Sequence, residues 1–267
     1  MKFTDGYWMF KEGFEQSNAI EVYDYKVENN RIVLYTPFKS IQTKGDTLNL
    51  GMLTIEISSP IENVIGVKAY HHLGSSKKEP HFAITKQDVQ VEIEDQEAIL
   101  TLTSGKAQVV IDKTKGHYEL SFYFDGELKT ASLFKSLGYI KTKDTTYMKE
   151  ELTLQTHECI YGLGERFTPF VKNGQVVDID NKDGGTGSEQ SYKNIPFYIS
   201  SENYGIFVNS TGKVSYEIAS EKVSKVQFSD EGEKLHYYFV GGETMKEVLV
   251  NYTTLTGKPS LPPKWSF

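Results

Sequence analysis

Cysteine is almost missing from this chain of 267 residues, which contains only Cys159. A lone cysteine cannot form an internal disulfide bond, and its neighbours Ile160 and Tyr161 favour a buried thiol in a strand. The chain also lacks any apolar run of about eighteen residues, and residues 1–6 lack the apolar stretch of a signal peptide. We therefore expect a cytoplasmic protein with no membrane partner.

Clusters of positive charge are also missing. Lys and Arg number 29 against 36 Asp and Glu, which gives a net charge of −7 and an isoelectric point near 5.5. Phosphate backbones are bound by clustered basic side chains, so this composition argues against a nucleic-acid surface. His71, His72 and His81 flank a short polar loop without the spacing of a known metal motif. We expect neither a metal nor a cofactor.

What the chain has in abundance is alternation of apolar and polar residues between Ile20 and Phe239. This period of two is typical of strands with one buried face. It is clearest in two runs, whose apolar positions are Val89, Val91 and Ile93, and Tyr118, Leu120, Phe122 and Phe124. Turn signals such as Asp125-Gly126 separate the runs, which favours hairpins over βαβ units. The fold class is predicted to be an all-β sandwich, and its 17 Tyr and 15 Phe suit the gap between two sheets.

One short helix is predicted near the C-terminus, over residues 243–256. Thr244 can cap it and Glu247 can complete a capping box. Its apolar stripe is expected to comprise Met245, Val248, Leu249 and Tyr252. Residues 1–242 would then form the sandwich, and the proline-rich segment 257–267 would be a linker. Trp265 and Phe267 would begin an apolar strand of a further unit.

A glycine-bounded turn at residues 161–167 is the first candidate site. Gly162 and Gly164 allow backbone conformations that other residues avoid, and Glu165 and Arg166 are predicted to form a charge-assisted pair that fixes the turn. The segment lacks the Lys-Ser/Thr ending of a phosphate-binding loop, and no helix follows it. A structural role is therefore preferred for this motif.

The second candidate is a long polar loop, expected over residues 176–190. Its polar side chains are Asp178, Asp180, Asn181, Asp183 and Glu189. Long loops in compact domains are often functional, so this one is a candidate ligand contact, with a solvated tip as the equal alternative. Retaining glycoside hydrolysis needs two rigid carboxyl groups about 5 Å apart. Carboxylates on a flexible loop do not meet that need, so no catalytic residue is expected in this chain.

Several segments, in order along the whole chain, closely resemble the N-terminal region of bacterial α-xylosidases of glycoside hydrolase family 31. They are 1–8 (MKFTDGYW), 161–167 (YGLGERF), 181–186 (NKDGGT), 189–198 (EQSYKNIPFY), 220–228 (SEKVSKVQF) and 261–267 (LPPKWSF). The resemblance implies a β-sandwich of the galactose-mutarotase-like type, followed by a (β/α)₈ barrel. It also implies that the nucleophilic and acid/base aspartates lie on that barrel, beyond residue 267.

The resemblance further implies that one loop of this domain reaches over the barrel mouth. In such enzymes an aspartate of the loop contacts the sugar, and by position this is Asp183, with Asn181, Gly184 and Gly185 shaping the loop. Relatives often carry tryptophan where this chain has Asp180. The chain thus departs from the family pattern beside the residue expected to contact substrate.

Three hypotheses follow for the function. In the first, the chain is the non-catalytic N-terminal domain of a retaining α-glycosidase acting on α-xylosides, with its own catalytic barrel as partner and a homo-oligomer allowed. In the second, it is a freestanding carbohydrate-binding module. In the third and weakest, it is a mutarotase or epimerase that uses a histidine with a carboxylate.

Overall fold

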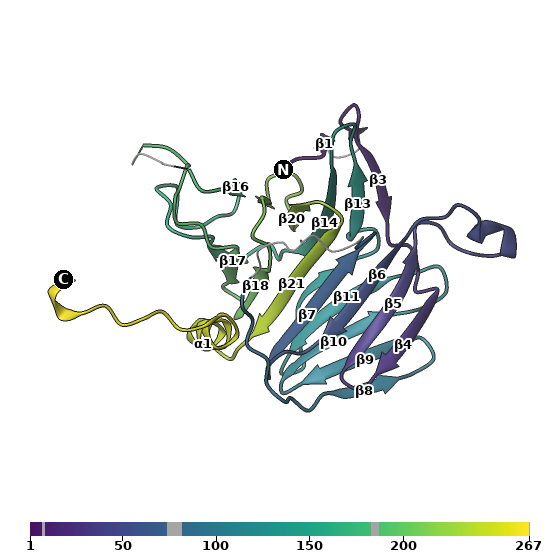
Figure 1. The fold of residues 1–267 in the computed structure, drawn as a ribbon, viewed down its shortest axis with the longest axis horizontal. Helices are drawn as coiled ribbons and strands as arrows, with labels where there is room; N and C mark the ends of the chain where they lie inside the picture. Colours follow the sequence, from purple (N-terminus) through teal and green to yellow (C-terminus); the bar gives the residue numbers. More distant parts are fainter. Residues whose placement is uncertain (7–8, 74–81, 183–186, 267) are drawn as a thin grey trace.

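The computed structural model describes residues 1–6, 9–73, 82–182 and 187–266 of the chain. Two antiparallel sheets pack face to face (Figure 1). The first has eight strands in the order β15-β17-β18-β21-β7-β6-β5-β4. Their bounds are β4 (Asp24–Glu28), β5 (Arg31–Pro37), β6 (Met52–Ser58), β7 (Val64–Tyr70), β15 (Ile160–Gly162), β17 (Phe197–Ser200), β18 (Tyr204–Val208) and β21 (Lys234–Gly241).

The second sheet has eleven strands, nine of them in the order β16-β19-β20-β14-β12-β11-β10-β9-β8, with β13 joining β14 to β3. Their bounds are β3 (Glu15–Asn18), β8 (Glu92–Asp95), β9 (Ile99–Ser104), β10 (Ala107–Asp112), β11 (Glu119–Phe124), β12 (Glu127–Ser132), β13 (Gly138–Lys141), β14 (Thr146–Thr153), β16 (Gln175–Ile179), β19 (Val214–Ile218) and β20 (Lys225–Glu231). The remaining elements are β1 (Thr4–Asp5), β2 (Met9–Phe10), the helix α1 (Met245–Thr256) and the 3₁₀ turns Lys44–Thr47 and Lys264–Ser266.

The core fills the gap between the two sheets. Alternate residues of β6 and β10, such as Ile55 and Val109, are fully buried, while their neighbours face outward. Phe122 of one sheet stacks on Phe239 of the other, with ring centroids 5.2 Å apart. This pattern confirms the predicted all-β sandwich, because period-two alternation gives each strand one apolar face to bury.

Strand β14 carries charged residues into the protein interior and was not predicted from the sequence. Lys149 and Glu151 are both buried and form an ion pair of 2.6 Å. Burial lowers the pKa of Lys149, and the nearby carboxylate of Glu151 opposes that effect. Glu150, on the opposite face of the strand, points into the core, where burial raises its pKa to about 7. Because three consecutive residues of this central strand are charged, no hydrophobicity pattern predicts it.

The helix α1 begins as predicted. Its N-cap residue Thr244 accepts a hydrogen bond of 3.2 Å from the Glu247 backbone N–H. The predicted capping box is wrong in its second half, because the Glu247 carboxylate accepts from the backbone N–H of Glu243 at 3.0 Å and not from that of Thr244. No helix in the described part of the chain is long and apolar enough to cross a membrane.

The predicted apolar stripe of α1 is partly wrong. Leu249 is 47% exposed, whereas Val248 and Leu255 are buried. The helix packs on the first sheet with Tyr252, whose ring stacks on Phe197 with centroids 4.0 Å apart. This contact turns Leu249 toward solvent, because only one side of the helix meets the sheet.

Three further local predictions are wrong. Residues 89–91 are not in a strand, because β8 begins only at Glu92, and the Val89 carbonyl instead accepts from the side chain of Asn30 in the turn between β4 and β5. Trp265 lies in a 3₁₀ turn and is 85% exposed, so it does not begin a strand. Cys159 directly precedes β15 and is a half-buried free thiol. Apolar content alone misplaced these residues, because it does not report whether a segment pairs with a neighbouring strand.

Candidate functional site

The turn at residues 162–164 runs against the segment that leads into β17. Gly162, Leu163 and Gly164 all have positive φ, at 101°, 67° and 92°. A Cβ added at Gly164 would lie 2.1 Å from the Lys193 carbonyl oxygen, so only glycine fits there. Leu163 is fully buried between the two glycines, and its N–H donates to the Phe197 carbonyl at 2.9 Å. The turn is therefore anchored in the core.

Arg166 links this turn to the two ends of the polar segment that follows β16. Its guanidinium donates to the carbonyl oxygens of Asp178 at 2.7 Å and Glu189 at 3.1 Å. It also donates to the Leu163 carbonyl at 3.1 Å and to the Asn194 side-chain oxygen. Burial lowers the pKa of Arg166 while the charge of Asp178 opposes this, and an arginine stays protonated in either case. One side chain thus holds four acceptors from different parts of the chain.

Two amide side chains complete the base of the segment. Asn194 donates through Nδ2 to Asn181 Oδ1 and to the Ser191 carbonyl, both at 2.8 Å. The Lys182 N–H donates to the same Ser191 carbonyl at 3.0 Å, and Asn181 and Ser191 form an isolated β-bridge. Sequence reasoning gave Asn194 no role, since a lone amide in a loop produces no periodic signal.

The predicted pair between Glu165 and Arg166 is wrong. The Glu165 carboxylate instead pairs with Lys193 at 2.6 Å, on an exposed surface. Two adjacent residues of an extended segment point in opposite directions, and here Arg166 turns inward while Glu165 turns to solvent. An exposed pair of this kind stabilises little, about 0–1 kcal/mol.

The predicted loop over residues 176–190 is shorter than expected. Residues Gln175–Ile179 form β16, which pairs with β19 at the edge of the second sheet. Asp178 belongs to this strand and accepts a hydrogen bond of 2.6 Å from Ser215. Its role is therefore structural. The irregular segment begins at Asp180.

The four residues that the resemblance selects are only partly described. Asn181 lies at the base of the segment, bonded to Asn194 as above. Asp183, Gly184 and Gly185 lie outside the described residues. Asp180 is described and faces a hollow of about 400 Å³, where Lys182 and Lys213 lie 3.6 and 3.9 Å from its carboxylate.

A depression of about 420 Å³ lies on the other side of the turn, beside Arg166 and Lys172. Three aromatic side chains line it and are largely exposed: Phe167, Phe170 and Tyr192. Exposed aromatic rings grouped in this way are typical of a surface that contacts another protein or a ligand. We name these three residues the aromatic patch.

His71 and the buried carboxylate of Glu158 stabilise the fold. His71 pairs with Glu233 at 3.0 Å and stacks on Tyr139. Glu158 is buried and accepts hydrogen bonds of 2.6 Å from both Ser200 and Tyr204. No group of three His, Cys, Asp or Glu residues within the described ranges could hold a metal ion. None of these groups forms the open pair of carboxyls that hydrolysis needs.

Two packed antiparallel sheets, one helix at their edge and a segment clamped at its base define a galactose-mutarotase-like β-sandwich. Residues 54–217 match the family described as the glycosyl hydrolase 31 N-terminal galactose mutarotase-like domain, and the chain belongs to this family. The family assignment confirms the resemblance seen in the sequence.

Two curated α-xylosidases resemble the whole chain. α-Xylosidase XylQ of Lactiplantibacillus pentosus is 49% identical over all of this chain, which covers 35% of that protein. An α-xylosidase of Emericella nidulans is 41% identical, again over all of this chain and 37% of its own length. The chain therefore spans only about a third of the length of these relatives.

Solved structures share the fold. A family 31 dextranase of Flavobacterium johnsoniae superimposes with a TM-score of 0.77 at 23% identity, over 93% of this chain and 29% of that one. A family 31 α-xylosidase from a soil metagenome, complexed with xylose, gives a TM-score of 0.70 at 17% identity, over 90% of this chain and 35% of that one. At such identities the likeness concerns the fold alone.

Proposed function

We propose that this chain is the non-catalytic N-terminal domain of a retaining α-glycosidase, most specifically an α-xylosidase, and that residues 181–191 help to select the substrate. The catalytic aspartates would lie on a barrel outside this chain. Two curated α-xylosidases that match the whole chain over about a third of their length support this assignment.

The observation that carries the proposed role of the segment is the position of Arg166. It binds the Asp178 carbonyl before the segment and the Glu189 carbonyl close to its end, so both ends are fixed to the sandwich. A contact residue acts on specificity only if its position is reproducible, because misplacement by about 1 Å costs much of a binding interaction. Asp183, between these fixed ends, is our candidate for the sugar contact.

We further propose that the aromatic patch of Phe167, Phe170 and Tyr192 packs against the catalytic barrel. The patch lies directly beside Arg166, so docking there would carry residues 181–191 to the barrel. Buried aromatic rings are frequent anchors of protein interfaces. On this proposal the exposed rings become covered in the intact enzyme.

The proposal is tested in the full-length parent enzyme with Asp183→Asn and Asp183→Ala. We expect kcat/KM for 4-nitrophenyl α-xyloside to fall at least about tenfold, a loss of about 1.4 kcal/mol in transition-state binding. Asp144→Asn, at an exposed turn far along the chain, is the control and should leave kcat/KM unchanged.

The isolated 267-residue chain should not hydrolyse the same substrate. Hydrolysis by this chain would contradict the assignment of catalysis to the barrel, and an unchanged kcat/KM in Asp183→Ala would contradict the role of the segment.

A further inference from the structure

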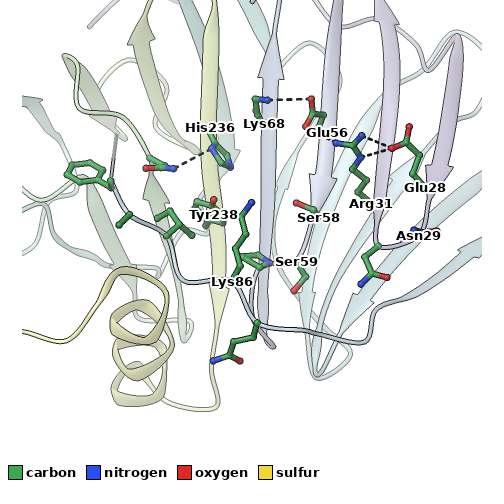
Figure 2. A pocket seen from close by; sticks show the side chains of 17 residues that line it. Glu28, Asn29, Arg31, Glu56, Ser58, Ser59, Lys68, Lys86, His236 and Tyr238 are labelled. Carbon is green, nitrogen blue, oxygen red and sulfur yellow. Dashed lines mark hydrogen bonds and ion pairs between the residues drawn. The ribbon is translucent and has the colours of Figure 1, made fainter. Parts of the chain in front are cut away.

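A second hollow lies on the outer face of the eight-stranded sheet, far along the chain from Arg166 (Figure 2). It has a volume of about 910 Å³, which lies within the range of about 300–1,000 Å³ typical of ligand sites. Its sides are the turn between β4 and β5 and the extended segment 82–87, and it reaches β21. We name it the sheet groove.

The floor of the sheet groove is low because a glycine lies between a serine and a tyrosine on neighbouring strands. Ser58, Gly66 and Tyr238 are direct neighbours on β6, β7 and β21. A Cβ at Gly66 would lie 2.8 Å from the Tyr238 ring, so the ring lies over the bare glycine backbone. Any larger residue at position 66 would lift the ring and fill the groove.

Polar side chains form the row beside this floor. Glu56, Lys68 and His236 are direct neighbours on the same three strands. Each lies two residues along its strand from the floor residue. Lys68 lies 3.4 Å from the Glu56 carboxylate, and Arg31 lies 3.7 Å from it while pairing with Glu28 at 2.6 Å. Figure 2 shows Lys68, Glu56, Arg31 and Glu28 in one continuous line. The charges within this line therefore compensate one another, and Lys86 on the opposite side leaves the groove with one positive charge in excess.

The ring side chains of the groove are neutral at physiological pH. Burial lowers the pKa of His236 to about 4, with the charges of Lys68 and two other lysines adding to that effect. Burial also raises the pKa of Tyr238 to about 12. The groove thus offers hydrogen-bonding groups without a large net charge, which suits a neutral polyhydroxy ligand better than an ion.

One buried polar atom in the lining lacks a partner. Asn209 donates to His236 Nδ1 at 3.4 Å, but its own side-chain oxygen is buried and has no hydrogen-bond partner among the described residues. A buried acceptor without a donor costs about 1–3 kcal/mol, so such a group usually meets water or a ligand. The exposed ring of Phe82 lines the same groove and offers apolar surface.

We propose that the sheet groove binds a neutral oligosaccharide, at a site that adjoins the hollow beside Asp180 through Phe82, which lines both. Sugars present hydroxyl groups that both donate and accept, which matches the carboxylate of Glu56 and the ammonium of Lys68 in the groove. Their C–H faces match aromatic rings such as Phe82. This inference does not depend on the proposed role of Arg166 or Asp183.

The test is an NMR titration of the ¹⁵N-labelled 267-residue chain with maltotriose, isomaltotriose and isoprimeverose in separate experiments. At least one should shift the amide signals of Ser58, Lys68 and His236 in a saturable way. Glu56→Gln should weaken this binding at least about tenfold, because it removes a charged acceptor. Glu127→Gln, which also breaks one exposed ion pair but lies outside the groove, is the matched control.

Three outcomes would overturn the proposal. The first is no saturable shift with any of the three sugars up to about 50 mM, a concentration that would reveal even millimolar affinity. The second is a response confined to Asn181, Arg166 and Asn194, which would place the sugar at the other site. The third is competition by inorganic phosphate at equal concentration, which would identify an anion site. Ser58→Trp, which fills the groove floor, gives a second check because it should abolish binding while the melting temperature shows that the fold remains.

Discussion

The hydroxyl group of Tyr237 on β21 donates a hydrogen bond of 3.1 Å to the Glu150 carboxylate on β14, so one polar contact joins the two sheets inside the sandwich. Neither side chain is exposed to solvent. Glu150 also accepts from Ser132 at 2.7 Å, and no basic side chain is hydrogen-bonded to it among the described residues. A carboxyl in such a place favours its protonated form.

Replacement of Glu150 by glutamine should change how stability depends on pH. Because the pKa is raised from 4.5 to about 7, the folded chain holds a proton that the unfolded chain releases between these values. The stability contributed by Glu150 is therefore present below pH 4.5 and is lost as pH rises through 7, by up to about 3 kcal/mol. Relative to wild type, Glu150→Gln should gain stability over that range, as measured by urea unfolding. The prediction would be contradicted if the unfolding free energies of Glu150→Gln and wild type changed with pH in the same way.

Replacement of His236 by glutamine should have the opposite sign. The folded chain keeps this imidazole neutral down to about pH 4, whereas the unfolded chain protonates it near 6.5. The stabilisation by His236 is thus present above pH 6.5 and is lost as pH falls through 4, by up to about 3 kcal/mol. His236→Gln should therefore lose less stability on acidification than wild type. Equal losses of stability in the two proteins between pH 6.5 and 4 would contradict this.

Gly164→Ala should destabilise the chain strongly. Its φ of +92° and the Lys193 carbonyl 2.1 Å from the added Cβ leave no room for a methyl group, so we expect a loss of more than about 3 kcal/mol. Gly174→Ala has a similar φ of +82° with nothing within 4 Å, and should cost only about 1 kcal/mol. Denaturant unfolding compares the two variants, and equal losses would show that close packing at Gly164 is unimportant.

Arg166→Lys should loosen residues 181–191 without unfolding the sandwich. A lysine keeps the charge but cannot reach the separate acceptors that the guanidinium binds. We expect hydrogen exchange at the Lys182 amide, which donates to Ser191, to rise at least about tenfold. Glu165→Gln, which affects only the exposed pair with Lys193, should leave that exchange rate unchanged. An unchanged exchange rate of the Lys182 amide in Arg166→Lys would show that the base of the segment is stable without the guanidinium.

Tyr252→Ala should weaken the attachment of α1 to the sheet. The ring stacks on Phe197 at 4.0 Å, and its removal leaves a cavity that we expect to cost about 3 kcal/mol. Leu249→Ala, on the exposed side of the same helix, should cost less than about 1 kcal/mol. The two melting temperatures measure this contrast, and similar losses would mean that the helix also uses its outer face.

The all-β fold could be predicted from the sequence because strands such as β6 and β10 alternate between buried and outward positions. Strand β14 could not, since Lys149, Glu150 and Glu151 are charged and buried together. Burial of Glu151 is compensated by Lys149 and by Lys222, which lies 71 positions away on the chain. An alternating pattern predicts strands that bury apolar side chains. It cannot predict a strand whose buried side chains are polar and paired.

The candidate site shows the same limit. Local sequence placed Arg166 beside Glu165 and suggested that the two would pair. The acceptors that hold the guanidinium come instead from Asp178, Glu189 and Asn194, which lie 12 to 28 positions further on. Contacts at such separations depend on how the strands are arranged, and spacing within a motif does not reveal them.

The bond between the Lys182 N–H and the Ser191 carbonyl brings both ends of residues 182–191 together at the edge of the sandwich. Because the ends of the stretch are already joined, its length can change at little cost in free energy. The stretch between these ends can therefore change in length or sequence while the sandwich that carries it keeps its architecture.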